Sequence, residues 1–153
     1  MTILNQLGKD KVVGHHPREF LRHGPGFLFV DEIIAFEGGL IVAARNVPLR
    51  EPWTEMHFPG NPILPGVFLI EGMAQTCGLL VRALGATAPK TMDGFLAGIK
   101  SAEFLKVVRP GARLIYEARL AAKALNLCLF DATTHSGGEL VSRAKICLSV
   151  SSE

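Results

Sequence analysis

Two side chains, His57 and Glu71, have the types and the setting that acid–base chemistry requires. His57 opens a loop dense in proline and glycine, and this loop runs directly into the apolar segment 67–84. Glu71 is the only acidic residue of that segment. An imidazole accepts a proton near neutral pH, and a carboxyl among apolar neighbours is suited to giving one. We therefore expect His57 to act as a base and Glu71 as an acid.

Neighbouring residues could complete such a site. Gln75 lies one helical turn after Glu71 and is expected to orient it by a hydrogen bond. Gly66 and Val67 begin the expected helix, whose first amides have no internal partners and could polarise a carbonyl oxygen. Two plainer interpretations remain open: Glu71 as an exposed acid on a solvated stripe, and Pro65-Gly66 as an ordinary helix start.

The other four histidines lack a comparable set of neighbours. They are expected to be structural or merely exposed, and they are His15, His16, His23 and His135.

The elements that must position these residues follow from hydrophobic periodicity and turn residues. Segments 27–36 and 40–47 predict a hairpin that turns at Gly38-Gly39. Residues 48–66 hold five of the nine prolines, which predicts a stiff irregular loop. A helix is expected over 67–84, followed by strands over 95–108, 113–124, 126–134 and 139–150. One helix and about six strands joined by short turns indicate an α+β fold with an antiparallel sheet.

Composition narrows the class of protein. The chain has 153 residues, 48% of them hydrophobic, which suits one domain over 1–153, and its net charge of +2 does not favour a nucleic-acid or membrane-surface partner. Its three cysteines show no metal-binding or disulfide pattern, and its first residues do not resemble a signal peptide. Since segment 67–84 contains Glu71, Gln75 and Arg82, it is not expected to span a membrane. We expect a cytoplasmic protein without a metal site.

Residues 57–75, with the sequence HFPGNPILPGVFLIEGMAQ, resemble the signature of the 3-hydroxyacyl-[acyl-carrier-protein] dehydratases. The resemblance is closest to the FabZ branch, because the related FabA branch has Asp where this chain has Glu71. It implies the hot-dog fold, in which a curved antiparallel sheet wraps a long central helix. It also implies a cis peptide near residues 57–59 and a homodimer, extended in some relatives to a trimer of dimers, in which His57 of one subunit faces Glu71 of the other.

The resemblance further implies a reaction: dehydration of a (3R)-hydroxyacyl thioester on acyl carrier protein to the trans-2-enoyl thioester. His57 would remove the proton next to the thioester carbonyl, the Gly66 amide would polarise that carbonyl, and Glu71 would protonate the leaving hydroxyl. No cofactor is expected, because the thioester itself supplies the acidity. The expected substrate contacts are Phe58, Pro59, Gly66, Val67, Phe68, Gln75, Phe95 and Leu96, with Met73 as a further candidate for the acyl tunnel.

An acidic carrier protein would need a basic docking patch, for which the candidates are Lys100, Lys106, Arg109 and Arg113. Glu103 and Leu105 stand where relatives often carry basic residues, so a specialised carrier or a coenzyme A thioester is an alternative. The pathway could be type II fatty acid synthesis or a related polyketide or specialised lipid pathway. Other functions left open are a hot-dog acyl thioesterase, an enoyl-CoA hydratase and a non-catalytic acyl-binding subunit.

Overall fold

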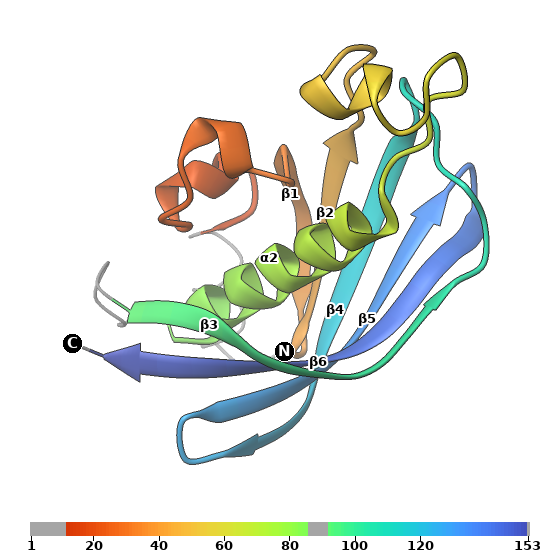
Figure 1. The fold of residues 1–153 in the computed structure, drawn as a ribbon. Helices are drawn as coiled ribbons and strands as arrows, with labels where there is room; N and C mark the ends of the chain where they lie inside the picture. The colour runs from red at the N-terminus through yellow and green to blue at the C-terminus, as the bar shows by residue number, and fades with distance from the viewer. Residues whose placement is uncertain (1–11, 86–91, 153) are drawn as a thin grey trace.

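One long helix lies across a curved antiparallel sheet in the computed structural model, which describes residues 12–85 and 92–152 (Figure 1). The helix is α2, Gly66–Leu84. The strands are β1 Glu32–Glu37, β2 Leu40–Asn46, β3 Met92–Phe104, β4 Arg113–Ala124, β5 Leu127–Ser136 and β6 Glu139–Ser152. Their order across the sheet is β1-β2-β4-β5-β6-β3. The predicted helix-and-sheet architecture of the hot-dog fold is confirmed.

Glycine pairs set two of the hairpins. Gly38 and Gly39 have φ of 56° and 77° between β1 and β2, and Gly137 and Gly138 have 58° and 79° between β5 and β6. Two successive residues with positive φ form the tight turn whose twist matches paired strands, and glycine adopts that conformation at least cost. These turns fix the antiparallel pairing of β1 with β2 and of β5 with β6.

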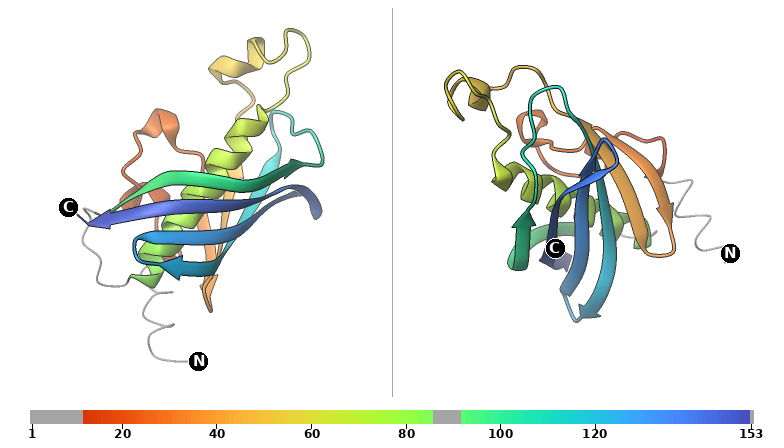
Figure 2. Two further views of the ribbon diagram at one scale, coloured as in Figure 1. Left: turned by 60° about the horizontal axis from the view of Figure 1, so that its bottom comes forward. Right: turned by 90° about the vertical axis from the view of Figure 1, so that its right-hand side faces the viewer.

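The hydrophobic core lies between α2 and the concave face of the sheet, which curves around the helix (Figure 2). Alternate residues of each strand point inward, as Tyr116 does from β4, Phe130 from β5 and Ile146 from β6, and each is fully buried. Helix α2 contributes Leu69, Met73 and Leu80 among others. Met73 is therefore part of this core. By length and composition α2 could cross a membrane, but 56% of that window is buried inside the fold.

The close packing of α2 on β4 depends on Gly72. A Cβ atom at this position would lie 2.3 Å from the hydroxyl oxygen of Tyr116, far inside van der Waals contact. Tyr116 is fully buried, and this burial raises the pKa of its phenol, which keeps the ring neutral. The absence of a side chain at Gly72 thus sets how near the helix that carries Glu71 can approach the sheet.

The prediction of a strand over 27–36 is wrong in its first half. Residues 25–27 form the 3-10 turn η2, Pro25–Phe27, and β1 begins only at Glu32. The physical reason is that the Phe29 amide and the Phe27 carbonyl bond to the side chain of Gln75 rather than to a neighbouring strand. Strand β3 likewise ends at Phe104 rather than at residue 108. The predicted proline-rich loop is largely irregular but contains a second such turn, η3 Pro52–Glu55.

We predict that Gly72→Ala lowers the free energy of unfolding by about 1–3 kcal/mol, since the added methyl must displace a buried ring. The matched control is Gly78→Ala on the same helix, where the new Cβ would meet only a Leu21 methyl at 3.5 Å. Alanine there should be neutral or stabilising by up to about 1 kcal/mol, because it favours the helix. Urea unfolding of both variants measures this; equal stabilities would contradict the packing argument.

Candidate active site

Backbone hydrogen bonds hold the loop that carries His57. The His57 amide donates to the Trp53 carbonyl at 2.8 Å, and the Ile63 amide donates to the His57 carbonyl at 2.8 Å. The His57–Phe58 peptide is cis, and the two rings stack with centroids 4.2 Å apart. The His57 Nδ1 atom lies 2.7 Å from the Ile63 carbonyl oxygen. A carbonyl only accepts, so Nδ1 carries a hydrogen, and in the neutral imidazole the lone pair is then on Nε2.

Glu71 is held on α2 by Gln75. The Gln75 Nε2 atom donates to Glu71 Oε1 at 2.9 Å, as the helical spacing predicts. The same Nε2 donates to the Phe27 carbonyl, and Gln75 Oε1 accepts from the Phe29 amide at 2.8 Å. Gln75 is only 2% exposed, so its amide is fixed and all of its hydrogen-bonding groups are used. Glu71 thereby has a defined orientation, with 24% of its side chain exposed.

A cavity of about 260 Å³ lies beside this pair. Its walls are residues 20–23, the face of α2 that includes Glu71 and Gln75, and the ends of β3 and β6. Phe95 and Leu96, expected to contact substrate, line it together with Leu148. Phe68 does not: its ring packs on Phe29. A largely apolar pocket with one oriented acid is suited to binding an acyl chain near a reacting group.

His57 is not among the described residues that line this cavity. Its loop precedes the first turn of α2, whereas the cavity begins at Glu71 and extends toward the end of the helix. One copy of the chain therefore brings Glu71, Gln75, Phe95 and Leu96 together and leaves the base outside their cavity.

The first turn of α2 lies at the surface. Val67 and Phe58 are 68% and 52% exposed, and Pro59 is exposed as well. Pro65 offers no side-chain cap to the helix, so the amides of Gly66 and Val67 keep the open position expected of an oxyanion site. Gly66 also packs against Phe104, because a Cβ there would lie 3.2 Å from its ring. Phe58 and Pro59 directly follow His57 in the chain, and Gly66 and Val67 begin the helix that carries Glu71. These four residues are not among those that line the cavity beside Glu71.

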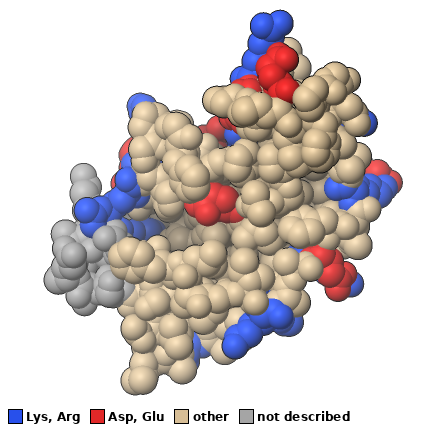
Figure 3. Space-filling model, viewed as in Figure 1, with Lys and Arg blue, Asp and Glu red and all other residues tan. Residues whose placement is uncertain are grey.

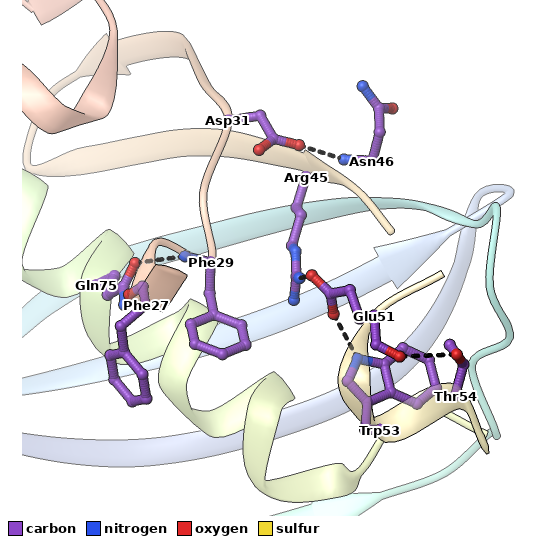
Figure 4. Close-up of polar contacts among 9 residues, drawn as sticks. All are labelled: Phe27, Phe29, Asp31, Arg45, Asn46, Glu51, Trp53, Thr54 and Gln75. Carbon is purple, nitrogen blue, oxygen red and sulfur yellow. Dashed lines mark hydrogen bonds and ion pairs between the residues drawn. The ribbon is translucent and has the colours of Figure 1, made fainter. Parts of the chain in front are cut away.

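A buried ion pair braces the His57 loop (Figure 4). The Arg45 side chain from β2 lies 2.7 Å from Glu51 Oε1, and the Trp53 indole donates to the other oxygen of Glu51. Arg45 is 3% exposed, and its guanidinium also lies 4.6 Å above the Phe29 ring. A buried cation needs such partners, because an unpaired charge in the interior costs several kcal/mol. The pair therefore ties η3, and with it His57, to the sheet.

The four cations expected to dock a carrier protein do not form one uniform patch. Lys100 is exposed on β3 and Lys106 pairs with Glu139. Arg109 donates to Asn61 Oδ1 at 2.8 Å, which braces the loop before α2. Arg113 pairs with Glu32 at the start of β1. On the face that carries α2, basic side chains stand toward the rim, and the middle is uncharged apart from one group of acidic atoms (Figure 3).

Sequence reasoning missed His23. The expectation that it lacks a comparable set of neighbours is wrong, because its Nε2 atom lies 3.6 Å from Glu71 Oε1 and it lines the same cavity. The two residues are remote in the chain, and the hydrogen bonds from Gln75 to Phe27 and Phe29 hold the segment that follows His23 against α2. No local spacing could have revealed this contact; the sole signal was the His-Gly-Pro-Gly turn that begins at His23.

A comparison with protein families matches residues 21–145 to the FabA-like domain. The chain is 40% identical over 134 residues to the bifunctional enzyme LpxC/FabZ of Chlorobaculum tepidum, covering 87% of this chain but only 28% of that protein. It is 36% identical over 135 residues to the 3-hydroxyacyl-[acyl-carrier-protein] dehydratase FabZ of Thermotoga maritima, covering 87% of this chain and 93% of that one.

Solved structures share the fold. The dehydratase heterocomplex ApeI:P of Xenorhabdus doucetiae matches with a TM-score of 0.76 at 17% identity, covering 91% of this chain and 93% of that one. A hypothetical thioesterase of Streptococcus pneumoniae, solved with coenzyme A, matches with a TM-score of 0.61 at 19% identity over 80% of this chain and 89% of that one. At such identities the likeness concerns architecture alone. The family match and the identity to full-length relatives decide the assignment: this chain belongs to the FabA-like family, in its FabZ group of 3-hydroxyacyl-[acyl-carrier-protein] dehydratases.

Proposed function

We propose that this chain converts a (3R)-hydroxyacyl thioester on acyl carrier protein into the trans-2-enoyl thioester and water. The observation that carries the proposal is the hydrogen bond from His57 Nδ1 to the Ile63 carbonyl, which makes Nε2 the basic nitrogen of the neutral ring. Glu71, oriented by Gln75 at the cavity, supplies the acid. Membership of the FabZ group supports the same reaction.

The steps balance without a further reactant. His57 Nε2 takes the proton from the carbon next to the thioester carbonyl, and the electron pair moves into that carbonyl. Amides at the start of α2, Gly66 and Val67, stabilise the negative oxygen by hydrogen bonding and by the helix dipole. The electron pair then forms the carbon–carbon double bond as the hydroxyl leaves with the proton of Glu71. The absence of a cofactor and the cytoplasmic location expected from the sequence stay predictions.

A second copy of the chain would complete the site. Strand β3 lies at one end of the sheet and exposes Phe95, Leu96, Ile99 and Phe104, each by 42% or more. An exposed apolar edge strand is a template for pairing with another strand. Pairing two copies through β3 would cover these side chains and bring the exposed His57 loop of one copy toward the Glu71 cavity of the other. We therefore propose a homodimer with shared sites, and assembly into a trimer of dimers stays a prediction.

Acyl carrier protein as the donor of substrate is supported by the FabZ relatives, which are named as dehydratases of 3-hydroxyacyl-[acyl-carrier-protein]. The four candidate docking residues, Lys100, Lys106, Arg109 and Arg113, are all exposed. Surface ion pairs such as Lys106–Glu139 contribute little to stability, so an acidic partner can replace Glu139 at small cost. The same holds for Arg113, which pairs with Glu32 at the surface. Arg109 bonds Asn61 and the Pro62 carbonyl of the loop before α2 and would contribute less.

A thioesterase fits the site less well. Hydrolysis needs a group that activates water at the thioester carbonyl, whereas His57 and Glu71 together are suited to removing a proton from one carbon and protonating the hydroxyl on the next. An enoyl-CoA hydratase would use the same residues in the reverse direction and differs only in the thioester carrier.

We predict that His57→Ala abolishes hydration of crotonyl-[acyl-carrier-protein] and that Glu71→Gln lowers its rate at least about 100-fold, the scale of a lost general acid or base. The measurement is the loss of enoyl absorbance, with free thiol followed in parallel. A dehydratase consumes the enoyl group without releasing thiol; thiol release would favour the thioesterase instead. Near wild-type rates in either variant would contradict the assignment of that residue.

Mixing the two inactive variants tests the shared site. If His57 of one subunit serves Glu71 of the other, exchange of subunits between His57→Ala and Glu71→Gln creates mixed dimers with one intact site. Random exchange then restores about one quarter of wild-type activity, since half of the dimers carry one good site of two. A site built within one subunit would recover nothing, because each chain in the mixture lacks one essential group.

A further inference from the structure

We infer that His23 is a positioning residue for Glu71: its imidazole Nε2–H, together with Gln75, holds Glu71 Oε1 and leaves Oε2 to carry the transferred proton. The kinetic part of this inference rests on the proposed dehydratase function. Its structural part does not, since it concerns the contact between two described side chains.

The first observation is that both polar neighbours of the Glu71 carboxyl stand at the same oxygen. Gln75 Nε2 lies 2.9 Å from Oε1, and His23 Nε2 lies 3.6 Å from it. Within the described part of the chain, no hydrogen bond or ion pair is made by Oε2. An oxygen that accepts one N–H hydrogen bond and faces a second N–H group is the poorer place for a proton. A neutral Glu71 is therefore protonated on Oε2, the oxygen available to a hydroxyl leaving group.

The second observation concerns the tautomer of His23. Its Nδ1 atom is buried and makes no hydrogen bond within residues 12–85 and 92–152, and its ring stacks on Phe27 at an interplanar angle of 16°. A neutral imidazole has one N–H group. On Nδ1 that group would be buried without an acceptor, whereas on Nε2 it faces a carboxylate. The surroundings thus select the Nε2–H form, which turns His23 into a donor toward Glu71.

The third observation is that this contact lies at the cavity itself. His23 and Glu71 both line it, so a bound acyl chain would exclude water from the space beside them. Exclusion of water strengthens charge-assisted hydrogen bonds, and contacts that are long in a free enzyme shorten when substrate binds. Because Glu71 becomes negatively charged as it gives up its proton, the His23 N–H group stabilises it most at that moment. The other charged groups at the cavity are Arg22, beside His23, and Arg82 on α2.

The kinetic test uses His23→Ala and His23→Gln in the full chain, with His15→Ala as the matched control. The Gln side chain retains a neutral N–H donor near the position of Nε2, and His15 contacts Glu19 and Phe20 rather than Glu71. For crotonyl-[acyl-carrier-protein], we expect His23→Ala to lower kcat about 10-fold to 100-fold with little change in KM, the scale of a hydrogen bond to a charged group. His23→Gln should recover most of kcat, and the control should match wild type.

A residue that acts through Glu71 has no effect on kcat once Glu71 can no longer donate a proton. In the Glu71→Gln background, His23→Ala should therefore cause no second loss of kcat. The inference would be overturned if His23→Ala caused its full loss of kcat in the Glu71→Gln background, or if His23→Ala alone had a wild-type kcat. It would also be overturned if His23→Gln failed to restore kcat and the Tm of the variants fell. A wild-type protein that does not hydrate the substrate refutes the proposed function instead.

The second test needs no activity. In the chain labelled with ¹⁵N-histidine, NMR should report His23 protonated on Nε2 and not on Nδ1 when neutral, and Glu71→Gln should shift the Nε2 resonance. The His15 resonances serve as the internal reference, because Glu71 does not contact that ring. A neutral His23 protonated on Nδ1, or an Nε2 resonance indifferent to Glu71→Gln, would overturn the inference whatever the enzyme turns over.

Discussion

The buried side-chain amide of Gln75 is the interaction on which the arrangement of the site depends. It accepts from the Phe29 amide and donates to both the Phe27 carbonyl and Glu71. A buried amide left with unpaired groups costs about 1–3 kcal/mol for each, so these contacts form together or not at all. Gln75 thereby holds the segment before β1 against α2 and orients Glu71. The same contacts position residues 20–23, which form one wall of the cavity.

The base is fixed by a separate set of contacts that meets this one at Phe29. The Phe29 backbone bonds Gln75, while its ring lies beneath the Arg45 guanidinium that pairs with Glu51. Trp53 continues the chain, since its indole bonds Glu51 and its carbonyl accepts from the His57 amide. Glu71 and His57 are thus held by one connected set of contacts within a subunit, although only Glu71 lines the cavity. Such a framework is what a site shared between two subunits requires, because each half must already be oriented when the other arrives.

Much of the fold and part of the candidate site could be predicted from local sequence. Glycine pairs located the hairpins, apolar character located α2, and the proline-rich loop located His57, because each of these signals acts within a few residues. The strand expected from residue 27 failed because its β-forming residues are held by a side chain 46 positions away from Phe29. His23 was overlooked for the same reason. The basic residues near β3 were found, but their internal partners, such as Asn61 for Arg109, depend on how the loop before α2 folds.

The order of strands has a consequence for how the chain reaches its fold. Strand β3 follows α2 in the chain, yet among the described strands it pairs only with β6, the last of them. Three further strands must form before β3 gains its neighbour, and contacts of such long sequence separation form slowly. During synthesis β3 therefore has no partner strand, and its apolar side chains stay exposed, until β4, β5 and β6 have been made. Strand β3, which we propose for pairing with a second copy, is therefore also the strand through which nascent chains would associate wrongly. The yield of folded protein should then depend on expression level and temperature more strongly than the stability of the folded protein alone would predict.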